Sequence, residues 1–128
     1  MRVLAGILVF WGVLIDGVGL FAMPLLGQCA FMSEMIKFTT CSAPVSVEAK
    51  IAAYLFGMCG IVRALAGLYP TERGAWLAGM GTMLLEVVVT WALTADPMQG
   101  APAIGVCSVF LGLMAATLPE AGAKGKRS

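Results

Sequence analysis

The sequence contains no histidine, and only 12% of its 128 residues carry a charge. The missing histidine removes the commonest general base and the commonest metal ligand, which argues against zinc sites, haem ligation and a Ser-His triad. The four cysteines never show the C-x-x-C spacing of zinc or thioredoxin-like sites. A net charge of +1 without a basic stripe gives no footprint for nucleic acid. We therefore expect no enzyme, no metal site and no nucleic-acid partner.

Hydrophobic sequence, by contrast, is abundant, at 60% of the residues. Four long runs stand out, approximately residues 3–23, 51–68, 75–94 and 103–118, followed by a tail over 119–128. A membrane-spanning helix needs about 20 apolar residues. The fourth run is short, and we expect it to borrow either residues 99–102 or the start of the tail. The pattern predicts an all-α integral membrane protein, a single four-helix bundle over residues 1–128.

The prolines and the basic residues predict how this bundle lies in the membrane. All six prolines are placed at segment ends or in loops, which indicates four uninterrupted helices. Four spans put both termini on one side. Five basic residues fall on that side, Arg2, Arg73, Lys124, Lys126 and Arg127, against Lys37 and Lys50 on the other. The positive-inside rule then places the termini in the cytosol or the mitochondrial matrix.

The longest loop, Gly27–Lys50, is predicted to face the opposite compartment. Its apolar residues predict a short amphipathic helix lying on the membrane or on a partner: Phe31, Met32, Met35, Ile36 and Phe38. Cys29 and Cys41 lie in this loop and would form a disulfide in an oxidising compartment, with two unlinked thiols as the open alternative. Cys59 and Cys107 fall inside hydrophobic runs and are expected to serve packing.

Three ionisable residues inside the hydrophobic runs are the most informative feature of the chain: Asp16, Arg63 and Glu86. A charge at this depth costs several kcal/mol unless it is paired or hydrated. Arg63 and Glu86 differ in predicted depth by roughly 9 Å, within reach of two long side chains. We expect Arg63 and Glu86 to form the main pair, with Asp16 joining it or facing a partner protein. The pair either fixes helix register or belongs to a proton or ion relay.

Small residues at four-residue spacing predict the helix-packing faces: Ala53 and Gly57, Gly60 and Ala64, Ala75 and Gly79. Such pairs let helices approach closely in lipid. Aromatic anchors are expected at the two ends of the third run, at Trp76 and Trp91, where they would lie at the membrane interface.

From Glu48 onward the chain resembles the ergosterol-biosynthetic protein twenty-eight family, small four-span scaffolds that tether sterol C-4 demethylation enzymes. The resemblance covers residues 48–106 most clearly, in the segments EAKIAAYLFGMCGIVRAL, LLEVVVTWAL and GAPAIGV. Arg63 and Glu86 match an arginine and a glutamate of the family's second and third spans. Asp16-Gly17 departs from an asparagine-containing stretch of the family's first span. The resemblance implies a non-catalytic scaffold. The tail Lys124–Ser128 also has the K-x-K-x-x form of an endoplasmic-reticulum retrieval signal.

Three functions are therefore carried forward. We favour a non-catalytic accessory or scaffold subunit of a large membrane complex, in the mitochondrial inner membrane, as part of a respiratory-chain or ATP synthase assembly. The alternatives are an endoplasmic-reticulum scaffold for sterol C-4 demethylation enzymes and a small proton or ion transporter. The expected partners are other integral membrane subunits and lipid, with no small-molecule substrate. No cofactor is expected, although the membrane setting allows structural lipids.

Overall fold

The structure, a computed structural model, describes residues 2–36 and 40–120 and is built of helices throughout that part of the chain. Four of its helical segments are long and apolar enough to cross a membrane: Arg2–Leu25, Val47–Leu68, Arg73–Leu93 and Met98–Ala116. The predicted fold class, a four-helix membrane bundle, is confirmed. The protein is a multi-pass membrane protein.

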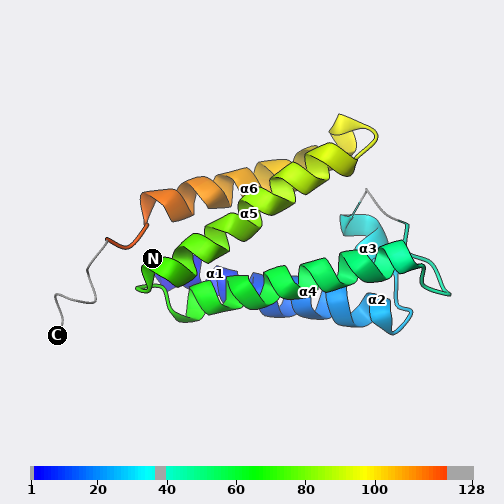
Figure 1. Cartoon of the computed structure of the whole chain (residues 1–128), viewed down its shortest axis with the longest axis horizontal. Helices are drawn as coiled ribbons and strands as arrows, with labels where there is room; N and C mark the ends of the chain where they lie inside the picture. Colours follow the sequence, from blue (N-terminus) through cyan, green and yellow to red (C-terminus); the bar gives the residue numbers. More distant parts are fainter. Residues whose placement is uncertain (1, 37–39, 121–128) are drawn as a thin grey trace.

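The four spans form two hairpins that lie close together at the end where α1 begins and farther apart at the end of α3 (Figure 1). The first span, made of α1 (Arg2–Phe10), η1 (Trp11–Ala22) and α2 (Met23–Leu25), packs along α4 (Val47–Leu68). The second hairpin consists of α5 (Arg73–Leu93) and α6 (Pro97–Ala116). The start of α1, the turn from α4 to α5 and the end of α6 lie at one end of the molecule. The expected placement of both ends of the bundle on one side therefore holds for the described residues.

The second and fourth spans begin well before their hydrophobic runs. Helix α4 starts at Val47 because Ser46 caps it, its side chain accepting a hydrogen bond from the Ala49 N–H at 3.2 Å. Helix α6 starts at Pro97, where Asp96 accepts from the Met98 N–H at 3.1 Å. The fourth run thus extends over residues 99–102, one of the two extensions expected. Polar capping residues set these boundaries, so a hydropathy pattern does not detect them.

The prediction that no proline interrupts a span is wrong at Pro102, which lies inside α6. Proline lacks an N–H and therefore removes one hydrogen bond from the helix, but neighbouring segments can compensate in a membrane bundle. Pro24 lies in the last turn of the first span, at the segment end predicted for it, and is buried. Both prolines are accommodated near the same end of the bundle, the end of α3.

The first span changes its helical form in its middle. Residues 11–22 form a π-helix, which is rare and is found mostly as single turns at functional sites. Nothing in the hydrophobic pattern indicates it. Gly12 and Gly60 bring η1 and α4 into backbone contact, since a Cβ atom added to Gly12 would lie 2.3 Å from the Gly60 carbonyl oxygen. In lipid such close van der Waals packing, and not exclusion of water, holds helices together.

Two apolar clusters lie at opposite ends of the bundle. The cluster nearer the termini contains Leu8, Ala66, Trp76 and Met114. Trp76 is fully buried and donates from Nε1 to the Met114 carbonyl at 2.8 Å, so its predicted role as an interfacial anchor is wrong. Trp91 is 72% exposed, as an anchor should be. The ends of a run therefore do not by themselves identify an interfacial tryptophan.

The second cluster includes residues of helix α3 (Ala30–Met35). The sequence predicted that this helix lies on the membrane or on a partner. A helix does form there, but it packs against its own bundle. Met32 and Ile36 are buried with Leu20 and Phe56, while Phe31 lies against Gly19. Phe38 lies outside the described residues. Folding back onto η1 and α4 buries this apolar face without any partner.

The loop that carries α3 is closed by a disulfide. Cys29 and Cys41 are bonded, with their Cα atoms 5.4 Å apart. This resolves the alternative that the sequence left open. Cys59 and Cys107 are free and buried, as expected of packing residues. The loop connecting the first span to α4 is therefore tied to the bundle by packing and by a covalent bond.

The disulfide predicts a definite count of reactive thiols. Denatured without reductant, the chain should take up two maleimide-polyethylene-glycol adducts, because two of its four cysteines are bonded. After reduction it should take up four. The variant Cys29→Ser should give three adducts without reductant, since Cys41 is released. Four adducts on the unreduced wild type, read as band shifts on a gel, would show that the bond is absent.

The contact between η1 and α4 predicts that Gly12→Ala destabilises the bundle. The added methyl group would meet backbone atoms of Gly60 and Ala64, which cannot turn away. Overpacking of this kind costs about 1–3 kcal/mol in free energy of unfolding. Gly6→Ala is the matched control, because nothing lies within 4 Å of its added Cβ. Equal stability of the two variants in detergent, followed by circular dichroism during denaturation, would refute the close contact.

Candidate functional site

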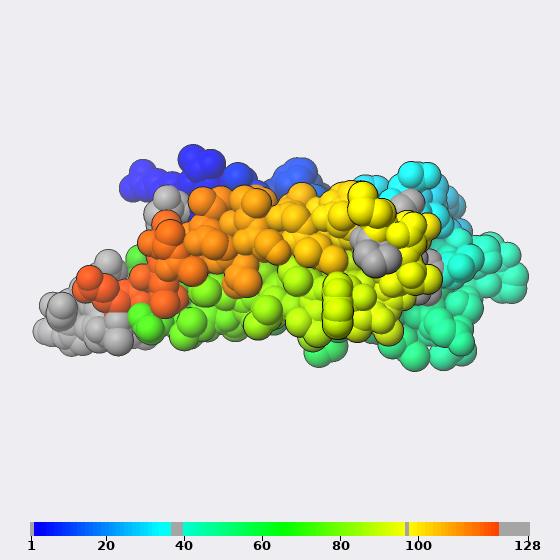
Figure 2. Space-filling model, turned by 90° about the horizontal axis from the view of Figure 1, so that it is seen from above, coloured from blue at the N-terminus to red at the C-terminus, as the bar shows by residue number. Residues whose placement is uncertain are grey.

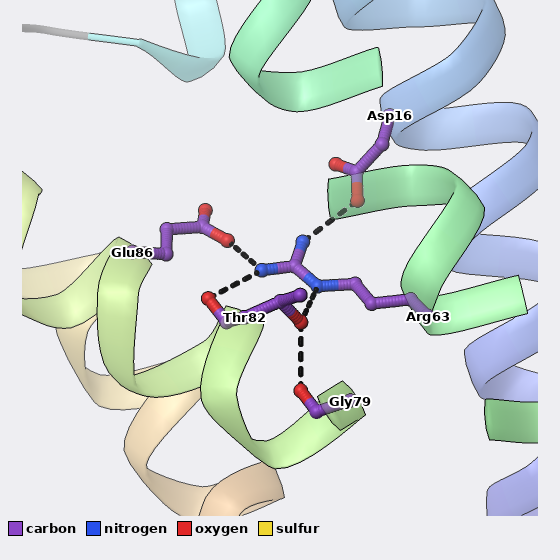
Figure 3. A network of polar contacts seen from close by, with 5 residues as sticks. All are labelled: Asp16, Arg63, Gly79, Thr82 and Glu86. Atoms are coloured by element: carbon purple, nitrogen blue, oxygen red, sulfur yellow. Dashed lines mark hydrogen bonds and ion pairs between the residues drawn. The ribbon is translucent and has the colours of Figure 1, made fainter. Parts of the chain in front are cut away.

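The three ionisable residues of the spans meet in the middle of the bundle, around the guanidinium of Arg63 (Figure 3). Nη1 of Arg63 lies 2.7 Å from Oδ2 of Asp16, and Nη2 donates to Oε2 of Glu86. Asp16 comes from η1, Arg63 from α4 and Glu86 from α5. The predicted charge cluster is confirmed. Asp16 faces the core of the bundle and takes part as directly as Glu86 does.

Thr82 completes the coordination of the guanidinium, and the sequence interpretation missed it. Nε of Arg63 donates to the Thr82 hydroxyl at 3.0 Å, and Nη2 donates to the Thr82 carbonyl at 3.2 Å. The hydroxyl in turn donates to the carbonyl of Gly79 at 2.7 Å. Thr82 lies four residues before Glu86, so both face the same side of α5. A threonine at that spacing from an intramembrane carboxylate was the signal available in the sequence.

Aromatic rings cover the remaining side of the cluster. The Arg63 guanidinium carbon lies 5.1 Å from the centre of the Trp11 ring, a cation–π contact. Trp11 packs edge-on against Phe110 of α6, with ring centres 5.1 Å apart. The Cys107 thiol lies beside Glu86. The cluster therefore touches all four spans, and a change at Arg63 reaches each of them.

The charges of the cluster do not balance. Two carboxylates face one guanidinium, so the ionised cluster carries a formal charge of −1. Arg63 and Asp16 are both fully buried, whereas the Glu86 side chain is 12% exposed. The indole of Trp11 lies beside Asp16, yet Oδ1 of Asp16 has no hydrogen-bond partner among the described residues. Buried polar atoms are nearly always paired, so this atom calls for an explanation.

A cavity of about 400 Å³ adjoins the cluster, and both Asp16 and Glu86 line it. It lies between η1, α3 and α6. Figure 2 shows α3 (cyan) at the end of the molecule where α6 begins (yellow). The walls are mostly apolar and include Trp11, Leu20 and Val106. This volume falls within the range of about 300–1,000 Å³ usual for small-molecule sites.

The predicted packing residues have different roles. Gly57 packs against Phe21 and Gly60 against Gly12, both on the face of α4 that meets η1. Ala53 is fully buried, and the backbone of Ala64 lies next to Gly12. Gly79 contacts Ala66 across the α4–α5 interface. Ala75 is partly exposed. The described residues contain no group of three histidines, cysteines or carboxylates able to hold a metal ion.

We predict that removal of the Arg63 guanidinium greatly lowers the free energy of unfolding. Arg63→Leu leaves Asp16 and Glu86 facing each other without a cation, which costs about 3–5 kcal/mol in free energy of unfolding. Arg2→Leu is the matched control, because Arg2 is exposed at the start of α1. Denaturation of the detergent-solubilised variants, followed by circular dichroism, measures both.

Combined variants separate the two carboxylates. Arg63→Leu with Glu86→Leu should regain only part of the stability, because Asp16 is fully buried and stays unpaired. Adding Asp16→Leu should regain most of the remainder, since an apolar cluster of similar volume is tolerated. If the double variant is already as stable as the triple one, Asp16 does not pair with Arg63.

Comparison with known proteins adds no relative to this picture. No protein-family model matches the chain, and no curated protein or solved structure matches it. The resemblance to the sterol-scaffold family therefore depends on the segments between residues 48 and 106 quoted above. The outer faces of the spans and the Arg63 cluster are therefore the features that bear on its function.

Proposed function

We propose that this protein is a non-catalytic accessory or scaffold subunit of a larger assembly of membrane proteins. The observation that carries the proposal is a row of small, exposed residues on α6: Ala101, Gly105, Ser108, Gly112 and Ala115. Their spacing of four, three, four and three residues places them on one face of the helix. A Cβ atom added to Gly105 or Gly112 would have nothing within 4 Å. Small-residue faces of this kind let a second helix approach closely in lipid.

The weak internal packing of α6 supports this assignment. Only 17% of the apolar 18-residue stretch of α6 is buried inside the bundle, compared with 44% of the corresponding stretch of α4. Its helical neighbour is chiefly α5. A span held so loosely by its own chain still has most of its surface available for helices of other subunits.

A second outward surface lies on the other hairpin. An apolar groove of about 470 Å³ runs between η1 and α4, lined by Gly12, Gly17, Gly57, Gly60, Val13 and Ile61 among others. The groove and the small-residue face of α6 belong to different hairpins, so two neighbouring subunits can be held at once. This arrangement suits a subunit that bridges others, and no catalytic residue is required for it.

For the membrane, we propose the mitochondrial inner membrane, with a respiratory-chain or ATP synthase assembly as the complex. The endoplasmic-reticulum scaffold for sterol C-4 demethylation enzymes is the alternative. It is supported by the resemblance over residues 48–106 and by the tail Lys124–Ser128, which lies outside the described residues. The disulfide calls for an oxidising compartment on the loop side, which both membranes provide.

The small-residue face of α6 predicts which substitutions disrupt assembly. Gly105→Leu combined with Gly112→Leu should reduce association with the complex about tenfold or more, because the bulky side chains hold a neighbouring helix away. The fold of the chain should be unchanged, since both positions face open space. Gly81→Leu on α5 is the matched control, because Gly81 is also exposed and open. The measurement is a native gel of membranes solubilised in mild detergent.

Equal association of the double variant and the control would refute the role of α6. Mass spectrometry of the native band identifies the assembly. Respiratory-chain or ATP synthase subunits would place the chain in the mitochondrion, and sterol demethylation enzymes would place it in the endoplasmic reticulum. A chain that always migrates alone would overturn the proposed function altogether.

A further inference from the structure

The cavity beside Arg63 has an unusual chemical make-up. Three carboxylates line it, those of Asp16, Glu34 and Glu86, and no lysine or arginine is among the described residues that line it. Arg63 makes four hydrogen bonds, which go to Asp16, Glu86 and Thr82. The cavity therefore adjoins an excess of negative charge within an otherwise apolar enclosure.

The unpaired oxygen of Asp16 points to what is missing. Asp16 is fully buried, it lines the cavity, and its Oδ1 has no hydrogen-bond partner among the described residues. A proton on Oδ1 would neutralise the cluster but would leave the new O–H without an acceptor. A ligand that donates hydrogen bonds and carries a positive charge satisfies both requirements.

The cavity reaches the surface of the molecule beside the span α6. Val106 of α6 and Met35, the last residue of α3, both line the cavity, and each is 48% exposed. Trp11, Ile15 and Leu20 supply an apolar inner wall. A molecule that enters from the bilayer can therefore place a polar head near Asp16 and keep an apolar chain against these walls.

We propose that this cavity binds a single-chain cationic amphiphile with a primary ammonium head. The ammonium head lies between Asp16 and Glu86. Its three N–H groups donate hydrogen bonds to the two carboxylates, and its positive charge offsets the excess negative charge of the cluster. Its chain lies along Trp11, Ile15 and Val106 toward the lipid. The sequence predicts no small-molecule substrate but allows structural lipids, and an amphiphile of this kind belongs with the lipids. It is independent of the proposed scaffold function, because it uses neither the outer face of α6 nor the groove between η1 and α4.

Photoaffinity labelling in native membranes tests the inference on the full chain. The probe is a dodecylamine carrying a diazirine in its chain, compared with the dodecanol that carries the same group. Labelled peptides are identified by mass spectrometry after purification of the chain. The amine should label residues of η1 and α6 that line the cavity, and excess unmodified dodecylamine should compete. Labelling by the alcohol should be about tenfold weaker, because it lacks a charge-assisted hydrogen bond to the carboxylates.

Variants of α6 provide the matched control. Val106→Trp introduces a large ring into the lining and should reduce labelling at least about fivefold. Val109→Trp adds the same ring at an exposed position outside the lining and should leave labelling unchanged. Asp16→Asn should lower labelling by the amine to the level of the alcohol. Circular dichroism separates a labelling loss from a folding loss, and the two valine variants keep the test informative if Asp16→Asn does not fold.

Several outcomes would overturn the proposal. Equal labelling by amine and alcohol would show that the cavity takes apolar chains without regard to charge. Absence of competed labelling at η1 and α6 would show that water alone fills it. Labelling that appears only in Lys37→Ala would show that Lys37, which lies outside the described residues, supplies the positive charge itself. A wild-type chain that migrates alone on the native gel and is still labelled by the amine would count against the scaffold function and leave this inference standing.

Discussion

The structure depends on a fully buried arginine that can exist in a membrane only while it is paired. Arg63 meets Asp16 of the first span and both Thr82 and Glu86 of the third. Lipid offers a guanidinium no alternative partner, so separation of the hairpins would expose a charge at a cost of several kcal/mol. The apolar contacts between the hairpins carry no comparable penalty, because lipid tails solvate the same surfaces. The cluster thus specifies which faces meet, and the glycine contacts determine how closely.

Much of the fold follows from the sequence because the membrane limits the choices. Hydropathy is enough to predict four spans, and the alternation of spans is enough to put both ends of the bundle on one side. The cluster was predictable as well, since intramembrane charges must find one another. The participation of Thr82 in the cluster, however, was not predicted from the sequence. Thr82 is a common helix residue in a membrane, and only the spacing to Glu86 distinguishes it.

Other features escaped the sequence for identifiable reasons. The starts of α4 and α6 depend on hydrogen bonds that the side chains of Ser46 and Asp96 accept from backbone N–H groups, and hydropathy treats these polar residues as interruptions. The π-helical form of η1 coincides with the close contacts that Gly12 and Asp16 make with Gly60, and the hydrophobic pattern does not indicate it. The small-residue face of α6 does not stand out in the sequence because glycine and alanine are frequent in all four spans. The cavity is lined by residues of η1, α3, α5 and α6 together and has no signature in any one of them.

The chain order of the cluster has a consequence for biogenesis. Asp16 precedes Arg63, and both belong to the hairpin that is synthesised first. The arginine therefore has a partner as soon as α4 enters the bilayer, before Thr82 and Glu86 have left the ribosome. The charges of Asp16 and Arg63 therefore already balance each other when the first hairpin inserts. The third span then brings the additional carboxylate to a site that is already formed, so the excess negative charge arises only when the bundle closes.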